Sequence, residues 1–389
     1  MEPTPRVQPW GGLSQRPQKL GSPGTSRTIE PSHIKFSKTP EQCAQLIADV
    51  RAKKLKTYPR NCVSGKIITG NRALVDWFPE CSTTTSDLLD WTAPDRRTAC
   101  NHEQGFIEVH EVPSGNLVGT ATVEFVGKTE ATATPVGWSW TEDVAVSSFT
   151  GLGNPEGSSA EFVPCPGDCL GVDKSYLPTG VDSWHGSVSL QPVAMPSGTV
   201  LESWGNWLVQ FNDPRWANPI EIWTSGVVGR CDNAIGNRSP GCVYGNIWEI
   251  AWLSRSAAPE FADHVSQAQA SGLPGAPYSD TYLTKLDDPA LRQANGDKAC
   301  PSSIPRPQGK SCDEYPFRST YEGASTGGSD EARSFPGCEM PDPERTGPTG
   351  WSRCFILVGD NSSGGGQMSA FYSNERMLDG DPFQVGFVE

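Results

Sequence analysis

Twelve cysteines restrict the fold of this 389-residue chain more than any other feature. Their number is even, and the only close pair is the C-x₃-C of Cys165 and Cys169. A zinc site would need a second close pair or histidines at ligand spacing, and none of the five histidines is so placed. Disulfides in an oxidising compartment are therefore favoured, and they predict a secreted, extracellular protein. The sequence cannot give the connectivity. We expect the local pairs Cys231–Cys242, Cys300–Cys312 and Cys338–Cys354.

The chain is longer than one ordinary core requires, so two or three domains are expected. No run of about 18 apolar residues occurs, so we expect no contact with a membrane. Residues 1–36 are expected to be a disordered lead-in, because their first 27 residues are rich in Pro, Gly and Ser and lack an apolar h-region. A mature form whose signal peptide has been removed would begin in this way.

Residues 37–102 are expected to form a small, disulfide-bonded helical region. Its clearest helix spans Thr39–Lys54, where Thr39 can act as the N-cap, Pro40 suits the first turn and Gln42 can complete a capping box. The basic run that follows, residues 51–60, is expected to be solvated surface, with contact to an anionic partner as the alternative.

A strand pattern occupies residues 103–229 and predicts a β-sandwich-like accessory domain. Short, often alternating stretches are separated by Gly, Pro, Asn and Asp. They lie at residues 106–112, 117–127, 134–146, 184–195, 207–213 and 219–228. Seven tryptophans are concentrated here, and packing inside the sandwich is favoured over a carbohydrate-binding platform. They are Trp138, Trp140, Trp184, Trp204, Trp207, Trp216 and Trp223.

Residues 230–389 mix helices and strands without βαβ alternation, which predicts an α+β domain. We expect helices at residues 258–272 and 364–378, strands at 353–361 and 381–389, and a loop-rich passage from 273 to Pro307. The glycines at 364–366 either cradle a phosphate or allow a close helix approach.

Three acids within one short stretch, Asp313, Glu314 and Glu322, are the strongest functional signal in this region. Close carboxylates repel one another, so a positive partner is expected. They can be ligands of a hard cation or an acid/base pair of a glycosidase. Adjacent strand residues point to opposite faces, so a catalytic pair would join one of them to a distant acid such as Glu322 or Glu375.

Three ordered motifs resemble the NucA/NucB-type deoxyribonucleases, most closely the secreted actinobacterial versions. They are "CDEYPFRSTYEGA" (Cys312–Ala324), "GDNSSGGG" (Gly359–Gly366) and "FYSNERMLDGDPFQV" (Phe371–Val385). "FADHVSQAQASGLPG" (Phe261–Gly275) is similar to the family's His-containing helix. The resemblance covers roughly residues 230–389 and implies a ββα-metal-like nuclease fold.

The resemblance implies a role for each matching residue. Asp313 would activate the attacking water, with Glu322 orienting that water and Glu314 as a third catalytic candidate. Glu375 and Asn361 would hold a divalent ion, Mg²⁺ or Mn²⁺ with Ca²⁺ as a further option. His264 is expected to make a structural hydrogen bond, with a catalytic role as the alternative.

The expected function is that of a secreted, metal-dependent, non-specific endonuclease that cuts DNA, with RNA as a further possible substrate. The net charge of −14 is unfavourable for binding a polyanion. Bound metal and the phosphate-binding candidates Arg318, Arg353 and Arg376 would offset it. The alternatives are a non-catalytic cell-wall- or glycan-binding protein and a carboxylate-dependent glycoside hydrolase.

Overall fold

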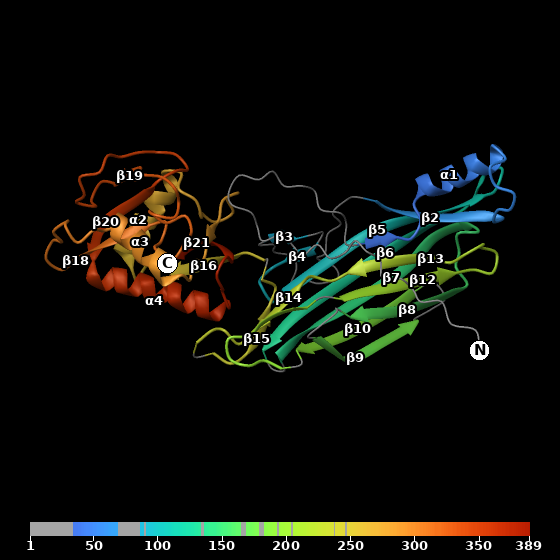
Figure 1. Cartoon of the computed structure of the whole chain (residues 1–389), viewed down its shortest axis with the longest axis horizontal. Helices are drawn as coiled ribbons and strands as arrows, with labels where there is room; N and C mark the ends of the chain where they lie inside the picture. The colour runs from blue at the N-terminus through green and yellow to red at the C-terminus, as the bar shows by residue number, and fades with distance from the viewer. Residues whose placement is uncertain are drawn as a thin grey trace.

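The computed structural model describes residues 34–68, 86–88, 91–133, 136–164, 169–178, 183–192, 194–203, 205–236, 238–245 and 247–389. The expected lead-in at 1–36 lies almost wholly outside these residues. The chain is elongated, with a β-rich part at one end and a mixed helix–strand part, formed by the C-terminal residues, at the other (Figure 1). No helix among the described residues is long and apolar enough to cross a membrane.

Two antiparallel sheets form the β-rich part. The smaller has the order β1 (Ile34–Phe36), β13 (Ile220–Ser225), β12 (Gly205–Asn212), β8 (Gly157–Pro164). The larger has the order β3 (Ser86–Leu88), β4 (Trp91–Ala93), β5 (Thr98–Glu111), β6 (Leu117–Ala133), β7 (Val136–Gly151), β10 (Ser183–Pro192), β9 (Cys169–Pro178), and β2 (Asn61–Ile68) pairs with β5. The inward residues of both sheets join one hydrophobic cluster, so the two sheets pack face to face.

Tryptophans fill this core. Trp207 of the small sheet packs edge-on against Trp184 and Trp140 of the large sheet, with ring centroids 5.0 and 6.2 Å apart. Five of the seven tryptophans considered above are buried: Trp138, Trp140, Trp184, Trp207 and Trp216. Trp223 is half-buried, and Trp204 lies outside the described residues. The packing interpretation of the buried tryptophans is therefore confirmed, because side chains inside the core cannot stack on a glycan.

The expected helix near residue 40 is α1 (Pro40–Arg51), and its capping box is present. The Gln42 N–H donates to Thr39 Oγ1, and the Thr39 N–H donates to Gln42 Oε1 at 2.8 Å. The strands of residues 61–68 and 91–102 belong to the large sheet, so this region is part of the sandwich and its proposed end at 102 falls inside β5. The helix α1 lies at the end of the sandwich away from the C-terminal part (Figure 1).

A small sheet forms the end of the β-rich part that is nearest the C-terminal part (Figure 1). Its order is β11 (Val200–Ser203), β14 (Gly229–Asp232), β15 (Gly241–Val243). The Cys231–Cys242 disulfide joins its paired strands β14 and β15. The sandwich core extends as far as Ile247 and the second core begins at Ala251, so the two cores separate between these residues rather than near residue 230.

The C-terminal part contains two three-stranded sheets and three helices, a mixed α+β arrangement. One sheet has the order β16 (Glu249–Ser254), β21 (Pro382–Val388), β17 (Leu283–Thr284), and the other β18 (Lys310–Tyr315), β20 (Trp351–Leu357), β19 (Ala332–Arg333). The helices are α2 (Pro259–Ala270), α3 (Pro289–Ala299) and α4 (Val358–Asn374). The passage expected to be loop, from 273 to Pro307, contains α3, and the last helix begins six residues before its expected start at Gly364. All three expected local disulfides are present.

Glycines in α4 explain how it packs and give a first prediction. A Cβ on Gly364 would lie 2.5 Å from the Phe261 ring of α2, whereas one on Gly366 would meet nothing within 4 Å. Gly364 therefore serves the close approach of two helices, and because it lies inside a helix it does not form a phosphate-cradling loop. We expect Gly366→Ala to raise the free energy of unfolding by about 1 kcal/mol. Gly364→Ala should lower it, because the ring must move. Denaturant unfolding of both variants tests this, and equal shifts would contradict it.

Candidate functional site

The acidic motif lies on β18, which pairs antiparallel with β20, the strand before α4. Asp313 is opposite Cys354, and Glu314 is opposite Arg353 on the antiparallel partner β20. Because strand side chains alternate, Ser311, Asp313 and Tyr315 face one side of the sheet and Glu314 faces the other. The helix α4 starts directly after β20.

On the first side, Asp313 is fixed by a histidine from α2. His264 Nδ1 lies 2.6 Å from Asp313 Oδ2, and His264 Nε2 lies 3.0 Å from Ser352 Oγ on β20. The Ser352 hydroxyl donates to the Tyr315 carbonyl oxygen at 3.3 Å. A hydroxyl has one hydrogen, so Nε2 must then donate to Ser352. The His264 ring and the Asp313 carboxyl group therefore hold each other in a fixed orientation.

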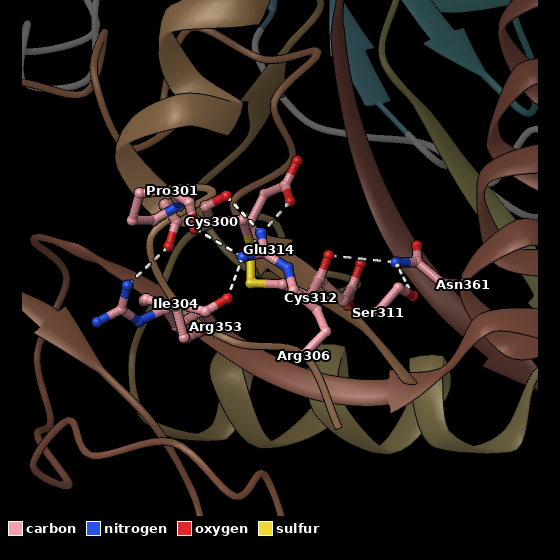
Figure 2. The surroundings of a disulfide bond; sticks show 12 residues. Cys300, Pro301, Ile304, Arg306, Ser311, Cys312, Glu314, Arg353 and Asn361 are labelled. Atoms are coloured by element: carbon pink, nitrogen blue, oxygen red, sulfur yellow. Dashed lines mark hydrogen bonds between the residues drawn. A yellow bond between two sulfur atoms is a disulfide. The ribbon is translucent and has the colours of Figure 1, made fainter. Parts of the chain in front are cut away.

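The first turn of α4 approaches the same side of β18. Asn361 Nδ2 donates to Ser311 Oγ at 2.9 Å and to the Cys312 carbonyl oxygen at 3.3 Å, which leaves its Oδ1 available (Figure 2). Asn361 lies within the helix, not at the end of the strand expected at residues 353–361. Asp360, the acid of this turn, accepts the Glu260 N–H at 2.7 Å.

On the other side of β18, Glu314 lies next to the Cys300–Cys312 disulfide (Figure 2). Its Oε2 is 3.7 Å from Cys300 Sγ, and its carboxyl group accepts the Arg318 backbone N–H. Burial, with a smaller contribution from the Asp313 charge, raises the pKa of Glu314 to about 7.

The raised pKa of Glu314 gives a second prediction. The folded protein keeps the Glu314 proton where the unfolded chain has released it, so the free energy of unfolding falls as the pH rises from about 4.5 to about 7. Glu314→Gln removes this loss. The variant should match wild type in urea unfolding at roughly pH 4 and be more stable at pH 8, while Glu344→Gln, at an exposed acid, should show no such difference. A stability gain of Glu314→Gln that is independent of pH would contradict this assignment.

Glu322 occupies a third position. Its Oε2 accepts the Thr284 N–H of β17 at 2.8 Å, and burial raises its pKa above the ordinary value. The chain folds it back towards Tyr315, whose pKa is raised by burial and, to a smaller extent, by the Glu322 charge.

Three other predicted site residues are held in ion pairs. Arg353 binds both carboxylate oxygens of Asp342 at 2.6 and 2.8 Å. Glu375 and Arg376 lie at the C-terminal end of α4, at the opposite end of the helix from Asn361. There Glu375 pairs with Arg97 at 2.5 Å and Arg376 with Asp232 at 2.6 Å, both partners belonging to the β-rich part. These contacts join the two parts of the chain and place Glu375 away from Asp313.

Whether the site can hold a divalent ion is a question of oxygen ligands. Among the described residues, no group of three or more His, Cys, Asp or Glu side chains is placed to hold a metal. A dedicated protein cage is therefore not found in the described part of the chain. Mg²⁺ keeps several waters and needs only one or two carboxylates, so the oxygens of Asp313, Asn361 and Asp360 are the candidates to hold a largely hydrated ion.

The structural hydrogen bond expected of His264 is present, but its partners Asp313 and Ser352 were not predicted. His264 is separated from Asp313 by 49 residues, so their contact could not be seen in the sequence. The signal that could have identified it was a histidine inside an amphipathic helix within the resembling segment.

Comparison with known protein families finds a match for the C-terminal part of the chain. Residues 279–386 match the model of the family deoxyribonuclease NucA/NucB. This range contains β17 to β20, α3, α4 and most of β21, but neither the sandwich nor α2 with His264. No curated protein and no solved structure matches the chain.

Proposed function

We propose, with the NucA/NucB match of residues 279–386 as premise, that the C-terminal part of this chain is a metal-dependent nuclease that hydrolyses phosphodiester bonds of DNA. The observation that carries the proposal is the fixed carboxyl group of Asp313 on β18, which His264 of α2 orients through a hydrogen bond. Asp313 acts as general base on the attacking water. His264 is a positioning residue, because its ring is fully buried and both ring nitrogens are engaged.

The order of contacts Ser352–His264–Asp313 has the connectivity of a serine hydrolase triad, which is a competing explanation. The nucleophile of such a triad must meet the substrate. Ser352 is completely buried and its hydroxyl donates to a backbone carbonyl, whereas Asp313 retains 7 % side-chain exposure. The accessible end of the chain of hydrogen bonds is thus the acid, which supports a base rather than an acylated serine.

The divalent ion of the proposal is Mg²⁺ or Mn²⁺, with Ca²⁺ as a further option. Asn361 and Asp360 at the start of α4, together with Asp313, are the residues that would hold it. When bound, the ion would neutralise charge on the phosphoryl oxygens and the leaving 3′-oxygen. The dipole of α4 favours an anionic group, such as the substrate phosphate, at this end of the helix.

The remaining candidates take different places in the proposal. Glu322 stays a candidate for orienting water. Glu314 faces the side of β18 opposite Asp313, where it contacts the Arg318 backbone, so we give it a structural role. We leave Glu375, Arg353 and Arg376 out of the site, because each is engaged in an ion pair. A glycosidase would need two carboxylates that flank one bond, and the opposite directions of Asp313 and Glu314 do not favour it.

The substrate preference and the location of the protein are also part of the proposal. Contacts to phosphate carry no base information, so cleavage with little sequence preference is proposed, on DNA with RNA as the alternative. Secretion is proposed from the disulfides at Cys43–Cys62, Cys231–Cys242, Cys300–Cys312 and Cys338–Cys354.

Nicking of supercoiled plasmid by the full chain tests the proposal. Cleavage is expected with Mg²⁺ or Mn²⁺ and should disappear with EDTA. Parallel reactions with single-stranded RNA and with a polysaccharide separate the substrates. Cleavage that is indifferent to EDTA would reject the metal dependence. Glycan release without plasmid cleavage would reject the nuclease.

A further inference from the structure

The basic side chains of the C-terminal part show where an anion is expected. Residues 247–389 are described without a gap and contain eleven Lys/Arg against twenty Asp/Glu. Seven of the eleven pair with a carboxylate: Arg255, Lys285, Lys298, Lys310, Arg345, Arg353 and Arg376. Arg306 and Arg333 donate to backbone carbonyl oxygens. Only Arg292 and Arg318 in this range have neither kind of partner for their guanidinium groups.

These two arginines line the same recess. It has a volume of about 360 Å³ and is bounded by Pro289, Arg292 and Gln293 of α3 and by Arg318. In a segment with almost twice as many acids as bases, arginines normally find carboxylates. Two that share one recess and have none leave a local excess of positive charge.

The recess holds Arg318 in place rather than leaving it free in solvent. Arg318 Nη2 donates to Gln293 Oε1 at 3.1 Å, and Gln293 Nε2 donates to Asp297 Oδ1 at 2.6 Å. The guanidinium also lies over Gly296, where a Cβ would come within 3.1 Å of its Cζ. A glycine inside α3 costs helix stability, and here it makes room for the arginine.

Nearby acids do not neutralise the pair directly. Asp288 uses its Oδ1 to cap α3, accepting the N–H groups of Ala290 and Leu291. Asp297 is held by Gln293. The Glu314 carboxyl group accepts the backbone N–H of Arg318. Guanidinium groups bind phosphate oxygens with paired N–H donors, so a phosphate monoanion suits the recess.

We propose that the recess of Arg292 and Arg318 binds a backbone phosphate of the substrate other than the one that is cleaved. This inference rests on the nuclease function proposed above. Glu314 connects the two places: it follows Asp313 in β18 but faces the opposite side, where it contacts Arg318. The backbone of Arg318 thus lies on the side of β18 opposite the proposed base, which suits a different phosphate of the substrate chain and not the reacting one.

The test measures binding separately from cleavage. The full chain is titrated into a fluorescent 20-base-pair duplex in EDTA at several NaCl concentrations. Arg292→Gln and Arg318→Gln should each weaken binding roughly tenfold at low salt. Each should also reduce the slope of log K against log [NaCl] by about one. Arg345→Gln removes the same charge from an exposed side chain of this part, 3.9 Å from Glu331, and should change binding little.

The outcomes decide between this inference and the proposed function. A wild-type protein that binds no duplex, or recess variants that bind as well as Arg345→Gln, would overturn the inference, whatever the plasmid assay gives. A failure of wild type to nick plasmid with any divalent ion would overturn the proposed nuclease function, while the titration would still test the recess.

Competition by inorganic phosphate at constant ionic strength is the second experiment. If Arg292→Gln loses phosphate binding but keeps duplex affinity, the recess serves free phosphate, and the assignment to the nucleic-acid backbone is rejected. Equal far-UV circular dichroism and melting temperatures show that the variants are folded.

Discussion

Asp313→Asn should lower kcat for plasmid nicking by roughly 10²- to 10⁴-fold, the usual contribution of a general base. Asparagine keeps the shape of the side chain and can still form a hydrogen bond with His264 Nδ1, so the fold should persist. Alanine is the poorer choice, because it would leave a buried histidine without its partner. Initial rates at saturating plasmid and a thermal melt of the same preparation separate the loss of catalysis from the loss of structure.

The matched control is Asp263→Asn on α2. It removes a carboxylate next to His264 in the sequence, but Asp263 is 64 % exposed and pairs with Arg255 at the surface. Its kcat should stay near that of wild type. If Asp313→Asn retains wild-type kcat with intact folding, Asp313 is not the base. If both variants lose activity equally, the effect comes from net charge rather than from the position of Asp313.

Local signals in the sequence were sufficient for many of the elements. Thr39 and Gln42 predicted the capping box of α1, and alternating stretches predicted the long strands of the sandwich. Pairs of cysteines separated by 11 to 16 residues predicted three disulfides, because short loops bring such cysteines together at little entropic cost. These features depend on neighbours in the chain, which a single sequence contains.

The elements that were missed depend on tertiary packing. The last helix was expected to begin at Gly364, yet α4 begins at Val358, and its residue Gly364 packs against Phe261 of α2. The helix α3 lacks a strong apolar face, although Asp288 and Pro289 are good start signals that could have identified it. In α4, tertiary packing outweighs the low helix propensity of glycine. In α3, the helix start signals in the sequence were not used.

The candidate site was predictable only as far as its motifs. Asp313 follows from the quoted segment, but its contact with His264 requires that α2 packs on the β18–β20 pair. The positions of Glu375 and Arg376 depend on Arg97 and Asp232, which belong to the other part of the chain. Charge partners from a separate domain leave no trace in local sequence, and the same applies to the recess of Arg292 and Arg318.

Asp381→Ala should lower the free energy of unfolding by about 3–5 kcal/mol, the cost of leaving buried charges without a partner. Asp381 joins the two parts of the chain: Arg96 donates to it at 2.7 Å and Arg230 at 2.6 Å, and all three side chains are buried. Burial alone would raise the pKa of Asp381, but the two arginines outweigh it and hold the pKa below the ordinary value. The variant would leave both guanidinium groups inside the contact between the parts. Urea unfolding at pH 7, followed by tryptophan fluorescence of the sandwich and by plasmid nicking, measures the loss.

Asp379→Ala is the control, since this acid lies in the same turn but is exposed. It should cost far less than Asp381→Ala. The pH dependence adds a second criterion. Because the pKa of Asp381 is lowered on folding, its contribution is fully present above the unfolded pKa, near 4, and is lost as the pH falls below it. The difference between wild type and Asp381→Ala should therefore shrink on acidification. Equal losses for the two variants at pH 7 would show that the two arginines do not depend on Asp381, and the sandwich and the C-terminal part would then be held together by their other contacts.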